Sequence, residues 1–342
     1  MEIYLGILLF SFIFSAVAIV PFIDLLYRLK FTHLKDDPPV KDNEKKESDV
    51  QALPQHLFKI GTPIGGGILI IFIVSLLFFL LYPIFVKSGP VVTFLYPLKE
   101  EINVLFFSFI SFGILGLYED IIKTFGYKWK VNIPGKKTVI ALLSTFIALL
   151  LYYNLDIAFI HLPFVGTLDI GWLYIPLVSS IIYFFTRSFD ITDGMDGLAS
   201  GMLLICLMAF WGISVTLLDF PLSVFIALWI GSLLAFMYFN VYPARIWLGN
   251  AGSLSFGATF AVVGLLLGKT DALFVIGSPF LLEGLMQLVQ KTWQTLFHKK
   301  IFSVTPLHYL LLSHGWLEPK IVFRSWLTAF IVSFLGLWFA TG

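Results

Sequence analysis

Residues 197–240 read GLASGMLLICLMAFWGISVTLLDFPLSVFIALWIGSLLAFMYFN, and Asp219 is their single charged residue. A helix needs about 20 apolar residues to cross the hydrocarbon core of a bilayer, and this stretch holds two such segments around a short turn. Unpaired strands cannot lie in hydrocarbon, so both segments are predicted to be transmembrane helices. The stretch therefore places the chain among the all-α integral membrane proteins.

The composition of the whole chain agrees with that class. Of 342 residues, 58% are hydrophobic and 13% are charged, whereas soluble domains have about 45–50% apolar and roughly 25% charged residues. The single cysteine, Cys206, lies in an apolar stretch, which excludes a disulfide framework and a cysteine-based metal site. Membrane lipids are expected partners, and nucleic acid is not.

Ten segments are long and apolar enough, or nearly so, to cross a bilayer. The first lacks a basic region before it and is long for a signal peptide, so we expect a permanent anchor. No repeat and no soluble domain are evident, and residues 1–342 are predicted to form one polytopic domain. The predicted spans lie near 3–29, 64–86, 102–120, 138–154, 172–188, 197–217, 222–240, 253–268, 272–293 and 321–340.

If each predicted span crosses the membrane in turn, most of the positive charge lies on one side. Of 22 Lys and Arg residues, all but Lys87, Lys99 and Lys269 lie on the same side. The positive-inside rule makes that side cytoplasmic and places both termini outside. On the cytoplasmic side, the polar loop 30–60 is predicted to be flexible. On the outer side, segment 155–171 combines apolar and turn residues, which predicts a short hairpin on the membrane surface.

Two cytoplasmic motifs open and close predicted spans. Residues 59–67 read KIGTPIGGG, and glycines at the start of a helix allow a phosphate or another backbone to approach closely. Packing between helices is the simpler explanation for this motif. Glu119 and Asp120 end the third span, where adjacent carboxylates are costly unless they are solvated, paired or metal-bound. A solvated helix end would also account for that pair.

Three aspartates follow at intervals of three, Asp190, Asp193 and Asp196, within the apolar sequence FDITDGMDGL. Like charges this close repel one another, and a divalent cation or cationic side chains would relieve the repulsion. The segment 240–253 combines Trp247, which can stack on a base, with a glycine-rich turn. A histidine, His308, follows in a loop near the C-terminus, where structural histidines are the more common case.

Carboxylates, lysines, an aromatic and a histidine therefore gather on the cytoplasmic face. Phosphoryl transfer between a soluble nucleotide and a membrane lipid needs such a set, because its catalysis is mostly positioning and charge stabilisation. A divalent cation would neutralise a diphosphate, and lysines would hold its oxygens.

At these motifs the chain resembles the polyprenyl-phosphate N-acetylhexosamine-1-phosphate transferase superfamily, and the resemblance covers nearly the whole chain. Members of that superfamily have ten spans with outside termini, use Mg²⁺, bind undecaprenyl phosphate in a groove and release uridine monophosphate. The resemblance therefore implies an active-site cleft open to the cytoplasm, a place in the inner (cytoplasmic) membrane, and a homodimer.

The resemblance is carried by short motifs, which we match one residue at a time. On the N-terminal side, Lys59 with Thr62 resembles the family pattern K-x-G-T-P, and Glu119-Asp120 with Lys123 and Lys137 resembles D-D-x-x-K with a later lysine. Asp193 with Asp196 resembles T-D-G-L-D-G, and Asn240 resembles the asparagine of F-N-x-x-P-A. Trp247 resembles the uracil-stacking aromatic, Gln290 a substrate-site glutamine, and His308 the histidine of P-L-H. The last of these motifs is similar to the muramoyl branch rather than the GlcNAc branch.

These matches imply a role for each residue. Asp120, assisted by Glu119, would deprotonate the lipid phosphate, with Asn250 and His308 as further catalytic residues. Mg²⁺ would bind at Asn250, Asp120 and Asp193. The residues expected to bind substrate are Lys59, Thr62, Lys123, Lys137, Asp190, Asp193, Asp196, Asn240, Trp247 and Gln290.

The chain departs from the family pattern at several of these positions. Glu119 stands where the family has aspartate, and Asn250 stands where it has a Mg²⁺-ligating aspartate. Asp190 replaces a family asparagine, so the site keeps its total charge. We hypothesise that Asp190 partly replaces the missing carboxylate. Tyr309 and Leu310 stand where the family has two further histidines.

The resemblance implies transfer of phospho-N-acetylmuramoyl-pentapeptide from its UDP-activated form to undecaprenyl phosphate, giving the first lipid intermediate of peptidoglycan. Three alternatives stay open. A GlcNAc-1-phosphate transferase for another surface polymer would use a different UDP-sugar. A degenerate homologue would bind lipid or cell-wall partners without turnover. A secondary transporter would carry polar residues near the midplane, whereas these cluster at one face.

Overall fold

The computed structural model describes residues 2–32, 61–88, 96–129, 135–162 and 166–341. Lys59 and nearly all of loop 30–60 lie outside these residues. The elements are α1 (Glu2–Arg28), α4 (Gly66–Ser88), α5 (Leu98–Trp129), α6 (Lys136–Asn154), β1 (Phe159–Leu162), β2 (Gly166–Asp169), η1 (Gly171–Leu173), α7 (Tyr174–Thr192), α8 (Leu198–Thr216), α9 (Phe220–Asn240), α10 (Gly249–Leu266), α11 (Thr270–Ile276), α12 (Ser278–Phe297), α13 (Leu307–Ser313) and α14 (Glu318–Thr341).

Each predicted span falls on helix, as expected for a multi-pass membrane protein. Among the described residues, eight helices are individually long and apolar enough to cross a membrane: α1, α4, α5, α6, α8, α9, α10 and α14. The 19-residue α7, which carries Arg187 and Asp190 near its C-terminal end, is not one of the eight. The count of ten crossings, and the direction of the bundle in the membrane, stay predictions.

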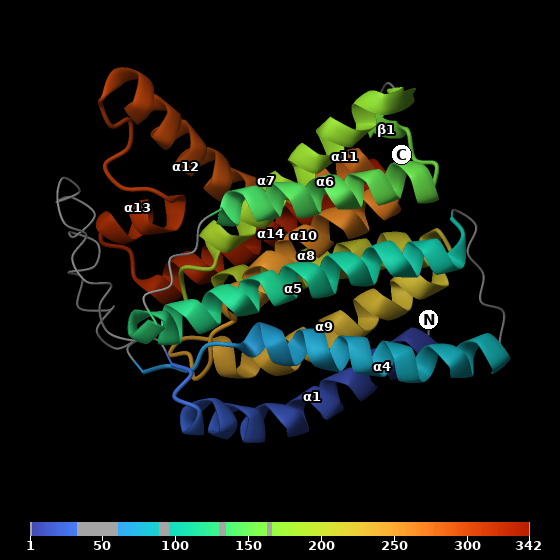
Figure 1. Cartoon of the computed structure of the whole chain (residues 1–342), viewed down its shortest axis with the longest axis horizontal. Helices are drawn as coiled ribbons and strands as arrows, with labels where there is room; N and C mark the ends of the chain where they lie inside the picture. The colour runs from blue at the N-terminus through green and yellow to red at the C-terminus, as the bar shows by residue number, and fades with distance from the viewer. Residues whose placement is uncertain (1, 33–60, 89–95, 130–134, 163–165, 342) are drawn as a thin grey trace.

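The ninth predicted span, 272–293, is two helices rather than one. α11 ends at Ile276, and α12 leaves it at an angle of 73°. Pro279, in the first turn of α12, has no N–H to continue the hydrogen bonding of α11. A Cβ at Gly277 would also clash with the ring of Phe185, so the chain bends at a residue that needs its small size. Figure 1 shows α12 projecting away from the bundle.

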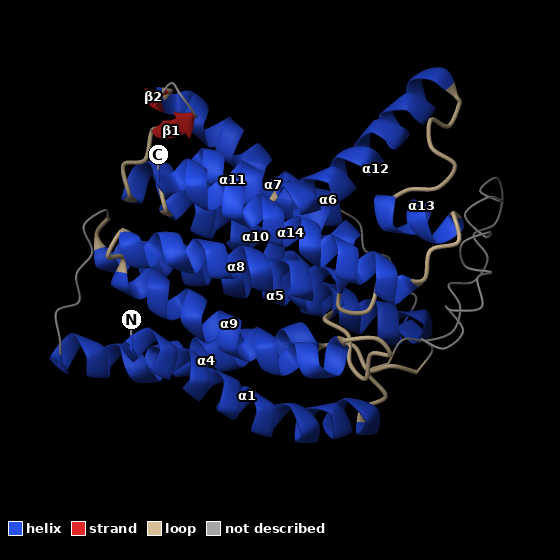
Figure 2. Cartoon of the chain, turned by 180° about the vertical axis from the view of Figure 1, so that it is seen from behind, coloured by secondary structure: helices blue, strands red, loops and turns tan. Residues whose placement is uncertain are grey.

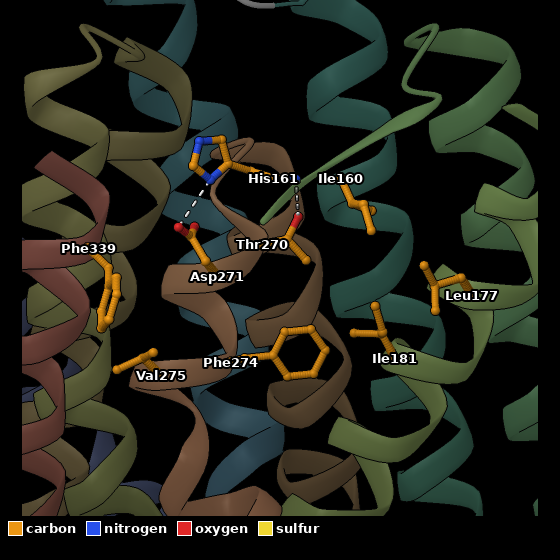
Figure 3. Close-up of a pocket in the computed structure, with 9 residues that line it drawn as sticks. All are labelled: Ile160, His161, Leu177, Ile181, Thr270, Asp271, Phe274, Val275 and Phe339. Atoms are coloured by element: carbon orange, nitrogen blue, oxygen red, sulfur yellow. Dashed lines mark hydrogen bonds and ion pairs between the residues drawn. The ribbon is translucent and has the colours of Figure 1, made fainter. Parts of the chain in front are cut away.

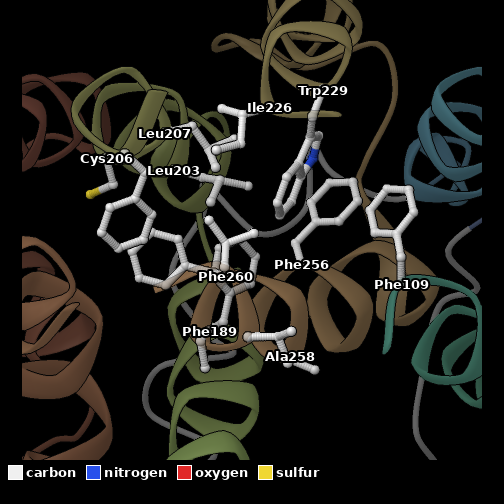
Figure 4. Packing of buried hydrophobic residues seen from close by; sticks show 14 of the residues in the cluster. Phe109, Phe189, Leu203, Cys206, Leu207, Ile226, Trp229, Phe256, Ala258 and Phe260 are labelled. Atoms are coloured by element: carbon white, nitrogen blue, oxygen red, sulfur yellow. The ribbon is translucent and has the colours of Figure 1, made fainter. Parts of the chain in front are cut away.

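The bundle is built around α10, in which 89% of the 18 residues that could cross a membrane are buried, compared with 22% in an 18-residue stretch of the peripheral α1. Aromatic rings from three other helices, Phe109, Phe189 and Trp229, pack against Phe256 of α10 (Figure 4), with ring centroids 5.9, 6.4 and 5.2 Å away. Such edge and offset contacts favour one relative placement of the helices. The core therefore fixes the positions of α5, α7 and α9 around α10.

The polar ends of these helices meet at one end of the bundle. The C-terminal ends of α5 and α7 lie there together with the N-terminal end of α10. Both chain termini lie at the opposite end with the β1–β2 hairpin, in which Phe159 pairs with Asp169 in antiparallel register (Figures 1 and 2). Because successive helices run in opposite directions, Asp120 of α5 and Asp190 of α7 lie at the same end of the bundle as Asn250 of α10.

Candidate active site

Asp120 holds the start of α10. Its Oδ1 accepts a hydrogen bond from the N–H of Asn250, and its Oδ2 accepts one from the N–H of Ala251, both at 3.0 Å. The first N–H groups of a helix lack partners within the helix, and a carboxylate there is also favoured by the helix dipole. Gly249 precedes them at φ +77°, a left-handed conformation that favours glycine. The side chain of Asp120 is thus placed by α10 as much as by α5.

The glycine motif fixes the same helix end from the other side. The N–H groups of Gly65 and Gly66 donate to the carbonyl of Trp247 at 3.1 and 2.8 Å, and that of Gly67 donates to Leu248 at 2.9 Å. Trp247 N–H returns a bond to Pro63 at 2.9 Å. These glycines serve backbone contact, the simpler of the two explanations considered for the sequence. Thr62 lies one residue before this pairing and is half-buried.

Glu119 faces two partners at the same place. The Nδ2 of Asn250 donates to its Oε2 at 2.8 Å, and the ammonium of Lys136 lies 2.6 Å from the same oxygen. Glu119 is buried, and its other oxygen, Oε1, has no hydrogen-bond partner among the described residues. One carboxylate oxygen is therefore left for a further cation or donor.

Asp190 joins this network through three side chains. Its Oδ2 lies 2.7 Å from Nη1 of Arg187 and 3.3 Å from Nζ of Lys136, and its Oδ1 accepts from the hydroxyl of Ser253 at 3.1 Å. Lys136 thus bridges Asp190 and Glu119. Two cations and two carboxylates balance one another, which relieves the repulsion expected between neighbouring acids.

The lysine that contacts these carboxylates is Lys136, whereas the role predicted for Lys137 in binding substrate stays a prediction. Lys136 lies four residues before Ile140, on the buried face of α6, and Lys137 is exposed. Lys123, one turn beyond Asp120 on α5, is also exposed. Arg187 and Ser253 were not predicted as site residues either. In the sequence, the only indication of such a role was position: Arg187 lies three residues before Asp190, and Ser253 lies three residues after Asn250.

Asp196 orients Trp247. Its Oδ1 accepts from the indole N–H at 3.1 Å and its Oδ2 accepts from the N–H of Ala244 at 3.0 Å. The backbone N–H of Asp196 donates to Glu318 at the start of α14, at 2.8 Å. The indole edge of Trp247, the ring predicted to stack on the base, is therefore held by Asp196, which was itself predicted to bind substrate.

His308 lies against the turn that carries Asp193. A Cβ added at Gly194 would approach His308 Nε2 to 2.6 Å, so the glycine leaves room for the ring. His308 Nδ1 lies 3.2 Å from Oε1 of Glu283, whose Oε2 accepts from the N–H of Leu307 at 2.8 Å. Glu283 in α12 thus positions the first turn of α13, the short helix that bears His308, which the sequence had placed in a loop.

Tyr309, which follows His308, reaches the same turn. Its hydroxyl donates to the carbonyl of Gly194 at 3.3 Å. Burial, followed by the nearby carboxylates of Glu318, Asp193 and Glu283, raises the pKa of Tyr309 to about 12. The phenol therefore stays protonated at neutral pH and serves as a donor.

Two amides predicted to bind substrate also make hydrogen bonds within the chain. Asn240 accepts from the hydroxyl of Ser200 at 2.6 Å and donates to the carbonyl of Ile246 at 3.0 Å. The Oε1 of Gln290 accepts from the N–H groups of Ile301 and Phe302 at 3.1 and 3.0 Å. Both amides shape the loops beside the site.

The free oxygen of Glu119 offers one more possible magnesium ligand beside the predicted Asn250, Asp120 and Asp193. Within the described residues, no group of three His, Cys, Asp or Glu side chains is arranged to hold a metal ion. Mg²⁺ commonly binds through one or two carboxylates, waters and substrate phosphates, so a protein cage is not required. Both oxygens of Asp120 accept from α10, whereas Oε1 of buried Glu119 has no hydrogen-bond partner within the described part of the chain. Glu119 therefore offers an oxygen without a hydrogen bond in this part of the chain, whereas each oxygen of Asp120 already accepts one.

Comparison with known proteins gives consistent matches across this site. The family "Glycosyl transferase family 4" matches residues 102–268, which include Asp120, Asp190 and Asn250. The chain is 30% identical over 317 residues to the phospho-N-acetylmuramoyl-pentapeptide-transferase of Clostridium perfringens, covering 91% of this chain and 90% of that protein. It is 31% identical over 319 residues to the transferase of the same name from Clostridium beijerinckii, covering 92% and 90%. The corresponding values for Staphylococcus epidermidis are 30% over 314 residues, 88% and 92%.

Proposed function

The chain belongs to the phospho-N-acetylmuramoyl-pentapeptide transferase family, and from this premise we propose that it transfers phospho-N-acetylmuramoyl-pentapeptide from its UDP-activated form to undecaprenyl phosphate. The products would be a lipid diphospho-sugar and UMP, made at the cytoplasmic face of the membrane. The observation that carries the proposal is the junction of Asp120, Glu119 and Asp190 with Lys136 at the N-terminal end of α10. Helices distant in sequence supply carboxylates and a lysine to one place there.

Asp120 is proposed as the base that takes the proton of the lipid phosphate. Two backbone N–H groups fix its carboxylate without using all its lone pairs, since each carboxylate oxygen has two. A base held rigidly by such donors is pre-positioned for proton transfer. Trp247, whose edge is held by Asp196, would stack on the uracil ring.

The charge balance of the network supports a metal requirement. Lys136 and Arg187 are matched by Glu119 and Asp190, so they bring no net positive charge to an incoming diphosphate. Bound Mg²⁺ would supply charge neutralisation on the diphosphate. We propose that Glu119, Asn250 and Asp193 hold it, with Lys123 and Lys59 near the phosphate oxygens.

The direct test uses purified full-length protein with undecaprenyl phosphate, Mg²⁺ and one UDP-sugar at a time. UMP release is expected with UDP-N-acetylmuramoyl-pentapeptide and not when the lipid is left out. Release with UDP-GlcNAc instead would assign the chain to the GlcNAc-1-phosphate transferases. No release with either sugar, although both substrates bind, would overturn the enzyme proposal and favour a homologue without turnover.

Substitution at Asn250 tests the metal assignment. Asn250→Asp would place a carboxylate where an amide now donates to Glu119 at 2.8 Å, and the repulsion would call for a cation. We expect the Mg²⁺ concentration for half-maximal activity to fall about tenfold, which corresponds to about 1.4 kcal/mol. Asn154→Asp is the matched control, because Asn154 donates to Glu100 at 3.4 Å at the other end of the bundle. An unchanged Mg²⁺ dependence in Asn250→Asp would refute the assignment.

A further inference from the structure

A cavity lies at the end of the bundle opposite the candidate active site (Figure 3). Its volume is about 350 Å³, within the range of ligand sites. Its walls are apolar and come from four elements, β1, α7, α11 and α14. The wall residues are Ile160, Leu177, Ile181, Phe274, Val275 and Phe339.

A group of polar side chains borders one end of this apolar cavity. Nδ1 of His161 lies 3.0 Å from Oδ2 of Asp271, and the N–H of His161 donates to the hydroxyl of Thr270 at 3.4 Å. The Asp271 side chain is only 2% exposed, whereas that of His161 is 23% exposed. Figure 3 shows the imidazole at the edge of the group, with its second nitrogen directed away from the carboxylate. The cavity thus joins apolar walls to a polar group that solvent or a headgroup can reach.

The position of the cavity matches the opposite surface of a bilayer. The 18 residues of α10 separate Asn250 from the turn before Asp271, a rise of about 27 Å, close to the thickness of a hydrocarbon core. Tyr153 and Trp172, at the same end, are 68% and 70% exposed. Exposed Tyr and Trp residues collect at headgroup level in membrane proteins. His161 therefore lies at headgroup depth, and the apolar walls lie deeper.

We propose that this cavity binds one acyl chain of a membrane phospholipid, with the lipid headgroup against His161. Leu177 and Phe274 in its wall are 40% and 41% exposed, so the cavity opens sideways toward lipid tails. An amphiphile matches an apolar cavity that is bordered by a partly exposed polar side chain, here His161. The carrier substrate is a poor match, because its phosphate must reach Asp120 across the length of α10.

The test measures phospholipid binding to the delipidated full-length protein in detergent by native mass spectrometry, with dioleoyl phosphatidylethanolamine as the probe. The wild-type protein is expected to bind one molecule of this phospholipid more tightly than any further molecules of it. Val275→Trp fills the cavity and should weaken that first binding step at least tenfold. His161→Ala, which removes the headgroup contact, should weaken it severalfold. The matched control is Leu335→Trp, because Leu335 is 47% exposed on α14 but lies outside the cavity wall.

Three outcomes would overturn the proposal. The first is wild-type affinity in both Val275→Trp and His161→Ala. The second is equal weakening in Leu335→Trp. The third is displacement of the phospholipid by equimolar undecaprenyl phosphate, which would assign the cavity to the carrier. If Val275→Trp fails to give a monodisperse protein, Ile181→Phe enters the same cavity from α7 and replaces it. These variants should leave UMP release unchanged, because Val275, His161 and Ile181 lie at the opposite end of the bundle from Asp120.

Discussion

At the residue scale, Asp120 combines a structural bond with a proposed chemical role, and one substitution separates them. Asp120→Asn keeps an acceptor for one of the two N–H groups of α10 but removes the charge. We expect UMP release to fall at least hundredfold, the usual range for loss of a general base. The loss of stability should be only about 1 kcal/mol, as for a weakened helix cap. Turnover and melting temperature are measured on the same preparation.

Asp169→Asn is the matched control for this change. Asp169 also accepts a backbone hydrogen bond, from the N–H of Gly171 at 2.9 Å, but it lies in the hairpin at the other end. It should lower stability slightly and leave turnover unchanged. Normal turnover in Asp120→Asn would show that this carboxylate has only a structural role.

The two adjacent lysines of α6 give a second contrast. Lys136 contacts both Glu119 and Asp190, so Lys136→Gln leaves buried carboxylates without their shared cation. Hydrogen bonds to charged groups contribute about 1.5–3 kcal/mol, which predicts a ten- to hundredfold loss of kcat/KM. Lys137→Gln should change kcat/KM less than threefold. A larger effect at Lys137 would restore the sequence-based prediction.

The lysines also show what the sequence could and could not predict of the site. Glu119, Asp120, Asp190 and Asn250 were all identified from local motifs, and the structure brings them together. The sequence could not show that Lys136 rather than Lys137 faces the carboxylates, because the span of α6 is apolar around its circumference and has no periodicity that marks its buried face. Membrane helices lose this signal, since lipid and protein core are both apolar.

At the element scale, the contact between α4 and α10 decides the position of the site. A Cβ at Gly67 would clash with the backbone of Gly252, so Gly67→Ala must push the two helices apart. We expect it to destabilise the protein by about 1–3 kcal/mol, as overpacking does. Activity should fall as well, since the same pairing holds Trp247.

Gly212→Ala is the control for that change, because a Cβ there meets only Leu337 at an ordinary 3.7 Å. It should leave the melting temperature unchanged or raise it, since alanine favours helix over glycine. Equal melting temperatures for Gly67→Ala and wild type would mean that the α4–α10 contact can relax.

Hydropathy and charge predicted the helices well but not the bend between them. Each predicted span lies on helix because any chain in hydrocarbon must satisfy its own backbone. The break after Ile276 depends on Pro279 and on the fit of Gly277 against Phe185, a residue of another helix. Hydropathy averages over such features, so a window over 272–293 predicts one continuous span.

At the scale of the whole molecule, the separation of its two ends gives a test of orientation. His314, after α13, and Thr167, in the hairpin, are exposed at opposite ends. Cys206 is buried, so the native chain should give little background with a thiol reagent. In intact spheroplasts, an impermeant maleimide should label Thr167→Cys at once and His314→Cys only after lysis. Labelling of both before lysis would contradict the topology.

The bonds between Asp120 and α10 also set the order in which the site can be completed during synthesis. The two partners are 130 residues apart in the chain. At translation rates of 5–20 residues per second, α5 would wait on the order of ten seconds before α10 leaves the ribosome. Throughout that interval Asp120 is in the nascent protein without the two N–H groups that later bind it, whereas Glu119 can already pair with Lys136 of α6.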